Sequence, residues 1–149
     1  MNEFLIRQMH AGDIDRVEEI EQLSFSMPWS RSAFEAEMHD NDVACYLVVE
    51  TAASVIAYAG MWLIVDEAHI TNVAVAPEHR GLGIGEALLK AMIDKAKEKG
   101  AGAMTLEVRP SNTAARNLYA KMGFVLKGIR RHYYTDNKED AQIMWRDPL

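Results

Sequence analysis

Cysteine is nearly absent from the sequence, since Cys45 is the only one in 149 residues. A disulfide framework within the chain and a zinc site built from several thiolates are therefore excluded. A single unpaired cysteine is typical of a small, buried apolar residue in a reducing compartment, and we expect this of Cys45.

Metal-site spacing and nucleophile motifs are also lacking. The five histidines are scattered, so we expect no metal. His69 ends the tetrapeptide Asp-Glu-Ala-His, which matches a helicase box. Because the chain has no phosphate loop of that class, we interpret the match as coincidence. None of the serines lies in the sharp glycine-flanked turn of a serine nucleophile, which disfavours a covalent acyl-enzyme.

Basic residues are in the minority and long apolar runs are absent. Lys and Arg number 16 against 22 Asp and Glu, and the net charge of −6 argues against a broad basic face for nucleic acid. The longest uncharged apolar stretch, residues 55–65, is too short to cross a bilayer. The N-terminal residues lack a basic segment followed by a long apolar run, so no secretory signal is expected. We expect a cytoplasmic protein with neither a membrane nor nucleic acid as a direct partner.

The length fits one domain, and no repeat or linker divides the chain. Turn signals and alternation predict strands over residues 4–7, 44–50, 55–65, 68–75, 104–108, 124–129 and 142–146. Helical periodicity predicts helices from a cap at Asp13 to about residue 24, over about 30–39, from the glycines at 81–85 to Gly100, and from a cap at Asn112 to Gly123. Asp66 and Glu67 are expected to form the turn between the second and third strands of a hairpin meander.

This order of elements predicts one α/β (α+β) domain over residues 1–149. We expect three α/β/α layers, in which a mixed, mostly antiparallel sheet of six to seven strands carries about four helices.

The most informative segment, residues 73–85, runs from a strand through a short turn into a helix. Directly after Arg80 come three alternating glycines, Gly81, Gly83 and Gly85. Consecutive backbone N–H groups at such a helix N-terminus suit a phosphate or pyrophosphate, and Arg80 adds a cation. No Gly-Lys-Ser/Thr follows, as a Walker motif requires, and Glu86 stands where a dinucleotide fingerprint has its third glycine. The alternative is a helix start whose glycines serve packing alone.

These residues resemble the acetyl-coenzyme A loop of the GCN5-related N-acetyltransferase (GNAT) family. The family motif Arg/Gln-x-x-Gly-x-Gly/Ala is matched by Arg80, Gly83 and Gly85. Further similarity covers essentially the whole chain, over residues 25–30, 106–115, 118–124, 130–134 and 139–144. Gly81, where a polar residue is common, and Pro110, in place of a small residue, depart from the pattern without removing a chemical group.

The resemblance implies a GNAT-type fold with acetyl-coenzyme A as the cosubstrate. In the family, the strand before the loop hydrogen-bonds the pantetheine arm and the thioester carbonyl through its backbone. Carried onto this sequence, the expected cofactor-binding residues are Val73, Ala74, Val75, Arg80, Gly81, Leu82, Gly83, Ile84, Gly85, Glu86 and Asn112.

Glu107 is the candidate base. A period of two puts Leu106 and Val108 on one face of their strand and Glu107 on the other. A lone carboxylate in an apolar strand costs free energy to desolvate unless it has a partner or a task. The alternative is an edge-strand glutamate that faces solvent. The resemblance implies that Glu107 accepts the proton of the acceptor amine, through water.

Tyr119 is the candidate acid. It lies on an apolar helical stripe, so its spacing alone favours a core aromatic. The resemblance implies that Tyr119 donates a proton to the coenzyme thiolate. Asn112 is expected to cap the same helix, and the resemblance adds a hydrogen bond to the coenzyme. A backbone N–H near Val75 is the expected donor to the oxyanion.

Four aromatic residues are candidate walls of the acceptor groove: Phe25, Trp29, Tyr133 and Tyr134. As alternatives, Trp29 fills the gap between two helices and the tyrosine pair packs across strands. An acidic cluster suits a basic acceptor, although such a cluster is also typical of a solvated face; its members are Glu18, Glu19, Glu21, Glu35 and Glu37.

The segments 130–134 and 139–144 are most similar to bacterial GNAT members that acetylate the N-terminal alanine of a small-subunit ribosomal protein. The resemblance therefore implies direct acetyl transfer to the N-terminal amine of a basic ribosomal protein, by a monomer or weak dimer. Two alternatives stay open. The acceptor could be another protein N-terminus, a lysine or a small amine, or the chain could be a non-catalytic acyl-coenzyme A-binding module.

Overall fold

The computed structural model describes residues 3–149, which form one seven-stranded sheet with four α-helices and two 3-10 helices. The strands are β1 (Leu5–Gln8), β2 (Ala44–Glu50), β3 (Val55–Ile64), β4 (Glu67–Val75), β5 (Ala103–Val108), β6 (Val125–Arg130) and β7 (Ala141–Arg146). The α-helices are α1 (Ile14–Ser24), α2 (Arg31–His39), α3 (Ile84–Glu98) and α4 (Thr113–Lys121), and the 3-10 helices are Ala11–Asp13 and Pro77–His79. Every strand lies within one residue of its expected bounds at each end.

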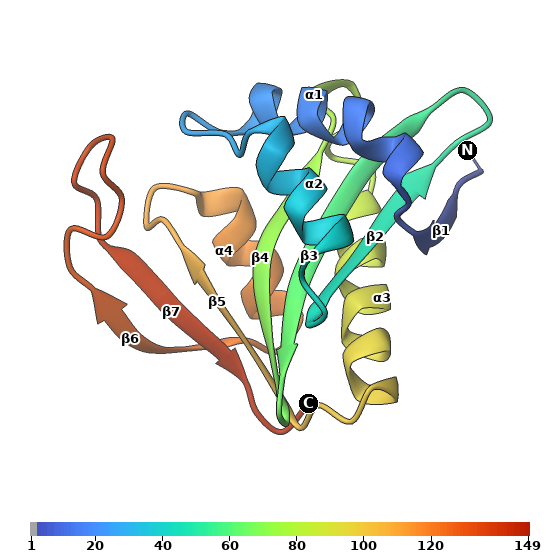
Figure 1. Cartoon of the computed structure of the whole chain (residues 1–149). Helices are drawn as coiled ribbons and strands as arrows, with labels where there is room; N and C mark the ends of the chain where they lie inside the picture. The colour runs from blue at the N-terminus through green and yellow to red at the C-terminus, as the bar shows by residue number, and fades with distance from the viewer. Residues whose placement is uncertain (1–2) are drawn as a thin grey trace.

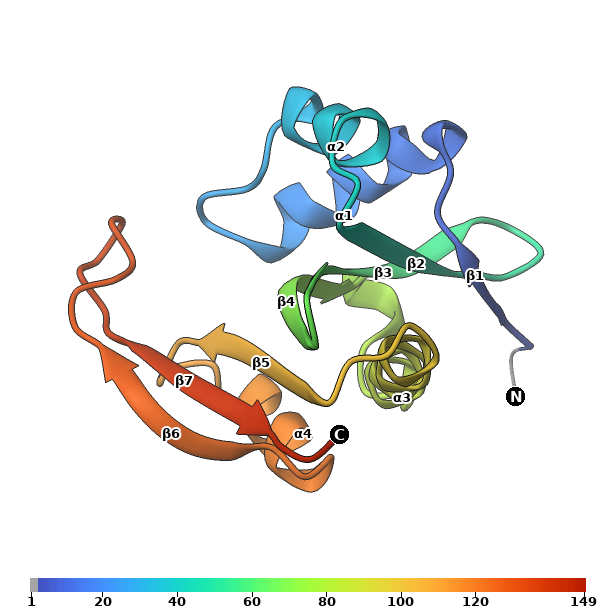
Figure 2. The same cartoon turned by 60° about the horizontal axis from the view of Figure 1, so that its bottom comes forward.

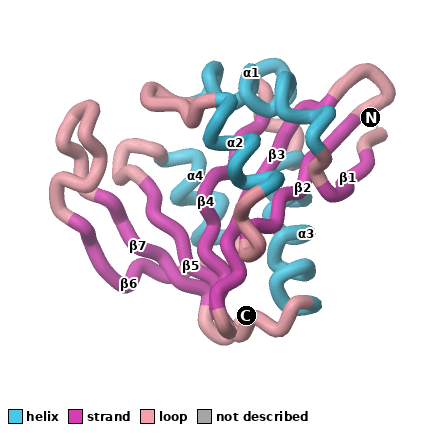
Figure 3. The backbone as a smooth tube through the Cα atoms, viewed as in Figure 1, coloured by secondary structure: helices cyan, strands magenta, loops and turns pink. Residues whose placement is uncertain are grey.

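The sheet runs in the order β1-β2-β3-β4-β5-β7-β6 (Figure 1, Figure 3), and all of its neighbouring pairs except β4–β5 are antiparallel. Helices α1 and α2 cover one face, while α3 and α4 cover the other (Figure 2). The expected three-layer architecture with a mixed, mostly antiparallel sheet is confirmed.

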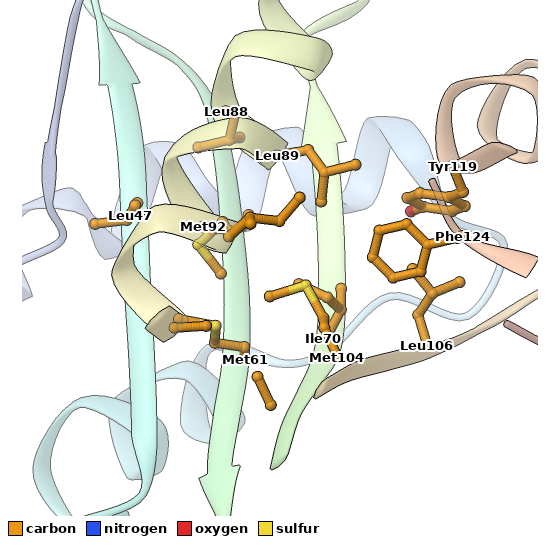
Figure 4. Packing of buried hydrophobic residues seen from close by; sticks show 14 of the residues in the cluster. Leu47, Met61, Ile70, Leu88, Leu89, Met92, Met104, Leu106, Tyr119 and Phe124 are labelled. Atoms are coloured by element: carbon orange, nitrogen blue, oxygen red, sulfur yellow. The ribbon is translucent and has the colours of Figure 1, made fainter. Parts of the chain in front are cut away.

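Each face of the sheet has its own apolar core. On the α3 side, Leu88, Leu89 and Met92 are fully buried against the sheet (Figure 4). Burial of each such side chain contributes about 1.5–3 kcal/mol to the free energy of folding. On the α1–α2 side, Phe34 meets Tyr58 edge-to-face with ring centroids 5.9 Å apart. The sheet is therefore held from both sides.

The entry into α1 differs from the sequence prediction. Asp13 makes no side-chain hydrogen bond to the N-terminus of α1. Its carboxylate instead accepts two hydrogen bonds from Arg7, at 2.8 and 2.9 Å, and one from the backbone N–H of His10 at 2.9 Å. The predicted cap is wrong because a bidentate guanidinium is a stronger partner for a buried carboxylate than a single helix N–H.

The turn between β3 and β4 lies one residue earlier than predicted. It consists of Val65 and Asp66, whereas Glu67 already pairs with Ile64 in the strand ladder. Val65 has a φ of 56° and its side chain is almost fully exposed. A β-branched residue at positive φ is rare, so the sequence gives no signal for a turn at this position.

A β-bulge in β4 shapes the centre of the sheet. Gly60 pairs with Asn72 and the next residue along β3 pairs with Ile70, so Thr71 is an extra residue on β4. A Cβ on Gly60 would lie 2.3 Å from the ring of Tyr46, so only glycine lets that ring cross β3 here. The bulge reverses the alternation of β4, and residues beyond it change the face toward which they point.

Strands β4 and β5 separate after His69, shortly before the bulge at Thr71. Their parallel pairing is confined to Glu67–His69 on β4 and Ala103–Thr105 on β5. Beyond this short ladder the two strands diverge (Figure 1, Figure 2). The backbone of residues 73–75 and the end of β5 therefore stand on opposite sides of an opening in the sheet.

Candidate active site

A cavity of about 730 Å³ lies between β4, the N-terminus of α3 and α4. Ten of the eleven expected cofactor-binding residues line it. The exception is Leu82, whose side chain is 62% exposed. The lining also includes Ser24, Phe25, Tyr119 and Lys121. The residues that the sequence assigns to one ligand thus surround one space.

The glycines of the loop have two different roles. Gly81 and Gly83 have φ values of 79° and 80°, which an L-residue rarely adopts, and a Cβ on either would meet no atom within 4 Å. Their missing side chains therefore leave the helix N-terminus open to the cavity. Gly85 has an ordinary conformation, and a Cβ there would lie 3.5 Å from Leu118 and 3.8 Å from Val75. Its role is close packing where the helix crosses the sheet.

Two cationic side chains lie near the glycine loop and line the cavity. Arg80 donates to the Val75 carbonyl at 2.9 Å and to Ser24 Oγ at 3.0 Å, so its guanidinium is fixed in place. Lys121 on α4 also lines the cavity, and its ammonium is 2.9 Å from Glu86. An open helix N-terminus beside two cations suits the pyrophosphate of coenzyme A. Neither Lys121 nor Ser24 is predicted from the sequence as a site residue, because only the fold brings them to the loop.

Glu107 lies on β5 and is not among the residues that line the cavity. Strand β5 is an interior strand between β4 and β7, so Glu107 does not face solvent from a sheet edge, and its side chain is only 14% exposed. Its Oε2 is 2.7 Å from Nε2 of His69 on β4. Burial raises the pKa of the Glu107 carboxyl, but the His69 hydrogen bond and the nearby charges of His69 and Arg130 hold that pKa below its ordinary value. Glu107 is therefore an ionised carboxylate at neutral pH.

His69 is the neighbour that the sequence analysis missed. The alternation of side chains along a strand is a usable signal here. Once His69 on β4 pairs with Thr105 on β5, Glu107 is the next residue on the same face of β5. The contact depends on the parallel pairing of two strands that are far apart in the chain.

Tyr119 is both a core residue and part of the cavity lining. The residue is buried and its ring lies 5.8 Å from that of Phe124 in the core (Figure 4), yet it also lines the cavity. Burial, with a smaller effect of Tyr134, raises the pKa of Tyr119 to about 12. Its hydroxyl therefore stays protonated at all physiological pH values. Asn112 caps α4 as predicted, with its side chain accepting from the N–H of Ala115 at 3.2 Å.

The four expected acceptor residues are placed differently from one another. Phe25 follows α1 and lines the cavity. The ring of Trp29 packs 5.5 Å from Phe34, while its backbone N–H donates to the buried Glu21 at 2.9 Å, so Trp29 plugs the gap between α1 and α2. Tyr133 and Tyr134 meet edge-to-face at 5.1 Å in the loop between β6 and β7, not on the strands themselves.

The loop between α1 and α2 touches the loop between β6 and β7. Ser26 donates to Asp136, and Thr135 donates to the sulfur of Met27 at 3.3 Å. Arg109, two residues beyond Glu107, anchors the second loop: its guanidinium is 2.8 Å from Asp136 and lies 3.9 Å from the Tyr134 ring centroid. The loop between α1 and α2, whose Phe25 lines the cavity, is thus in contact with the loop between β6 and β7.

Among residues 3–149, no group of three or more His, Cys, Asp or Glu side chains is arranged to hold a metal ion. No helix among the described residues is long and apolar enough to span a membrane.

Known sequences resemble this chain over almost its whole length. The profile of the "Acetyltransferase (GNAT) family" matches residues 14–124. A Bacillus subtilis protein named "Putative [ribosomal protein bS18]-alanine N-acetyltransferase" is 47% identical over 140 residues, which cover 94% of this chain and 93% of that protein. The "[Ribosomal protein bS18]-alanine N-acetyltransferase" of Escherichia coli is 36% identical over 141 residues, covering 93% of this chain and 94% of the E. coli protein.

Solved structures agree with the sequence comparison. The crystal structure of the ribosomal-protein-S18-alanine N-acetyltransferase from Escherichia coli matches with a TM-score of 0.89 at 34% identity, covering 98% of this chain and 94% of the other. Ard1 from Thermoplasma volcanium matches with a TM-score of 0.88 at 29% identity over 98% of both chains.

Proposed function

The chain belongs to the acetyltransferase (GNAT) family, whose members use acetyl-coenzyme A, and from this premise we propose that it acetylates the N-terminal alanine of a small-subunit ribosomal protein. Acetyl-coenzyme A, when bound, supplies an acetyl group activated as a thioester. In this proposal the amides of residues 80–86 hold the pyrophosphate, and the backbone of residues 73–75 directs the acetyl group toward Glu107. Asn112 adds a hydrogen bond to the coenzyme.

The observation that carries the proposal is the lining of the cavity. Ten of the eleven residues expected to bind the coenzyme surround it, and Tyr119 lines the same space. Glu107, on the strand that precedes the helix of Tyr119, supplies a mostly buried, ionised carboxylate. This arrangement suits proton transfer to and from a reacting amine and thiolate.

Glu107 is the proposed base. An N-terminal amine has a pKa of about 7.7–8.0, so roughly a tenth of it is neutral at pH 7, whereas a lysine amine at about 10.4 is almost wholly charged. An N-terminal acceptor thus requires only modest basicity, and a carboxylate with a lowered pKa, acting through water, is sufficient. A lysine acceptor would require a stronger base.

Tyr119 is the proposed acid, and it gives its proton to the coenzyme thiolate as the thioester bond breaks. A thiol has a pKa of about 8.5, and the pKa of Tyr119 near 12 makes complete transfer uphill by about 5 kcal/mol. We therefore assign Tyr119 a hydrogen bond that strengthens as charge develops on sulfur, with the proton following. A backbone N–H near Val75 is the proposed donor to the oxyanion.

The distribution of charge supports a basic acceptor. Residues 1–75 contain 13 Asp and Glu but only 3 Lys and Arg, whereas residues 76–149 contain 9 and 13. Helices α1 and α2 belong to the acidic half, and the glycine loop, α3 and α4 belong to the basic half. An anionic cosubstrate and a cationic acceptor are thus attracted to different sides of the molecule. Phe25, Tyr133 and Tyr134 are the proposed aromatic contacts of the acceptor.

Tandem mass spectrometry of one peptide tests the proposal. The peptide begins with alanine, is rich in lysine and arginine, and has a matched control whose α-amine is blocked. We expect acetyl on the α-amine of the first peptide and none on the blocked control. Equal acetylation of lysines in both peptides would contradict an N-terminal acceptor. No transfer to any amine, together with retained acetyl-coenzyme A binding, would favour the binding module.

A further inference from the structure

His69 is in direct contact with the proposed base. Nε2 of His69 and Oε2 of Glu107 are 2.7 Å apart, which is a hydrogen-bond distance. The two residues come from the parallel pair β4–β5, in which His69 is opposite Thr105 and Glu107 is the next residue on the same face. The contact thus lies where the short parallel ladder ends and the opening begins.

The other contacts of His69 hold its ring in one orientation. The ring lies edge-to-face against Trp62 on β3, with centroids 6.4 Å apart and an interplanar angle of 74°. Trp62 is itself fixed, because its Nε1–H donates to Glu37 on α2 at 2.7 Å. About a third of the His69 side chain stays exposed, so its ring can exchange protons with water while Glu107 remains mostly covered.

We propose that His69 is a positioning residue for Glu107. Its Nε2–H donates to Oε2 of Glu107, which fixes the carboxylate and leaves Oε1 to accept the proton of the acceptor amine. This inference rests on the proposed function, in which Glu107 is the base.

The proton balance distinguishes positioning from catalysis. When an ammonium acceptor becomes an amide and the coenzyme leaves as a thiol, one proton is released per turnover. In the proposal, Glu107 takes that proton from the amine and returns it to water, while His69 keeps its Nε2 proton throughout. The second N–H proton lost by the nitrogen balances the proton gained by sulfur.

Two substitutions test the inference. His69→Gln keeps an N–H donor near the position of Nε2, whereas His69→Leu removes the donor. The readout is kcat/KM for the peptide with an N-terminal alanine, given as the ratio of wild type to variant. Ionisation of the acceptor amine affects both enzymes alike, so it cancels in this ratio. Affinity for acetyl-coenzyme A is measured in parallel by calorimetry.

We expect His69→Gln to keep kcat/KM within about threefold of the wild type, because its amide N–H replaces the imidazole donor. His69→Leu is expected to lose about tenfold or more in kcat at every pH, with unchanged coenzyme affinity.

Equal losses of kcat in both variants would overturn the inference, because they would show that a hydrogen-bond donor at position 69 does not matter. Lowered thermal stability beside such equal losses would indicate mere packing against Trp62. These failures are distinct from failure of the proposed function, which predicts a wild-type enzyme that acetylates the peptide and a Glu107→Gln variant that does not.

Discussion

Arg80 and Ser24 join the glycine loop to the end of α1 through a hydrogen bond of 3.0 Å. The same guanidinium donates to the carbonyl of Val75 at 2.9 Å, so one side chain connects the loop, β4 and α1. Because Phe25 follows Ser24 directly, the connection runs from the proposed pyrophosphate site to the acceptor side.

Arg80→Lys tests this connection, since lysine keeps the charge but cannot make both hydrogen bonds from one planar group. We expect the dissociation constant of acetyl-coenzyme A to rise about tenfold, which corresponds to about 1.4 kcal/mol. Calorimetric titration measures the change. Arg116→Lys is the matched control, because Arg116 lies on α4 outside the cavity lining, and its affinity is expected to stay within about twofold of the wild type. An unchanged constant for Arg80→Lys would show that Arg80 serves the fold alone.

Gly83→Ala tests the conformation of the loop. Position 83 has a φ of 80°, so alanine costs about 1 kcal/mol of stability there, and its methyl group enters the space in front of the helix N-terminus. Gly100→Ala is the control, because Gly100 ends the same helix with a φ of 93° and equally open space. We expect similar losses of stability in urea, but weaker acetyl-coenzyme A binding in Gly83→Ala alone. Equal binding by the two variants would remove the loop from the coenzyme site.

Tyr119→Phe tests the proposed acid. The variant keeps the ring that packs against Phe124 and loses only the hydroxyl. We expect kcat to fall about 100-fold with little change in coenzyme affinity or melting temperature. Since the pKa of Tyr119 is raised to about 12, its deprotonation should cause no decline of wild-type kcat up to about pH 10. A wild-type rate in the variant would assign the hydroxyl to the core.

Arg7→Met tests the ion pair that replaces the predicted helix cap. Burial raises the pKa of Asp13, but the Arg7 hydrogen bonds lower it further, so the net pKa lies below its ordinary value. A lowered folded-state pKa contributes stability that is present above the unfolded carboxyl value of about 3.9 and is lost as the pH falls through the folded-state value.

We expect Arg7→Met to lose about 2–3 kcal/mol in urea unfolding at pH 7, because the buried Asp13 carboxylate loses its bidentate partner and Glu50 loses its ion pair. The loss should shrink toward about pH 4, where Asp13 in the variant takes up a proton. Arg31→Met, at an exposed pair with Asp15, should leave stability close to that of the wild type at either pH. Equal effects of the two substitutions would contradict a structural role for Arg7.

Local sequence signals were sufficient for most of the fold. Strand bounds follow from alternation, and the cap at Asn112 follows from its residue type. The prediction at Asp13 is wrong because its carboxylate has a tertiary partner, Arg7, on another element. The turn at Val65 has no local signal, since valine rarely adopts positive φ.

The site was less accessible to sequence reasoning because it depends on long-range pairing. The residues of the glycine loop are consecutive, so a motif could identify them. The bulge at Thr71, the separation of β4 from β5 and the contact of His69 with Glu107 arise only when distant strands pair. Lys121 and Arg109 belong to the same class, since their partners come from α3 and from the β6–β7 loop.

The most direct test of the account is the turnover of Glu107→Gln on a peptide with an N-terminal alanine, measured beside its calorimetric affinity for acetyl-coenzyme A. Glu67→Gln, at an exposed carboxylate on β4, is the control and should keep wild-type turnover. We expect Glu107→Gln to lose about 100-fold or more in kcat while its coenzyme affinity stays within about twofold of the wild type. Wild-type kcat in Glu107→Gln would contradict the proposal that this carboxylate on β5 is the base.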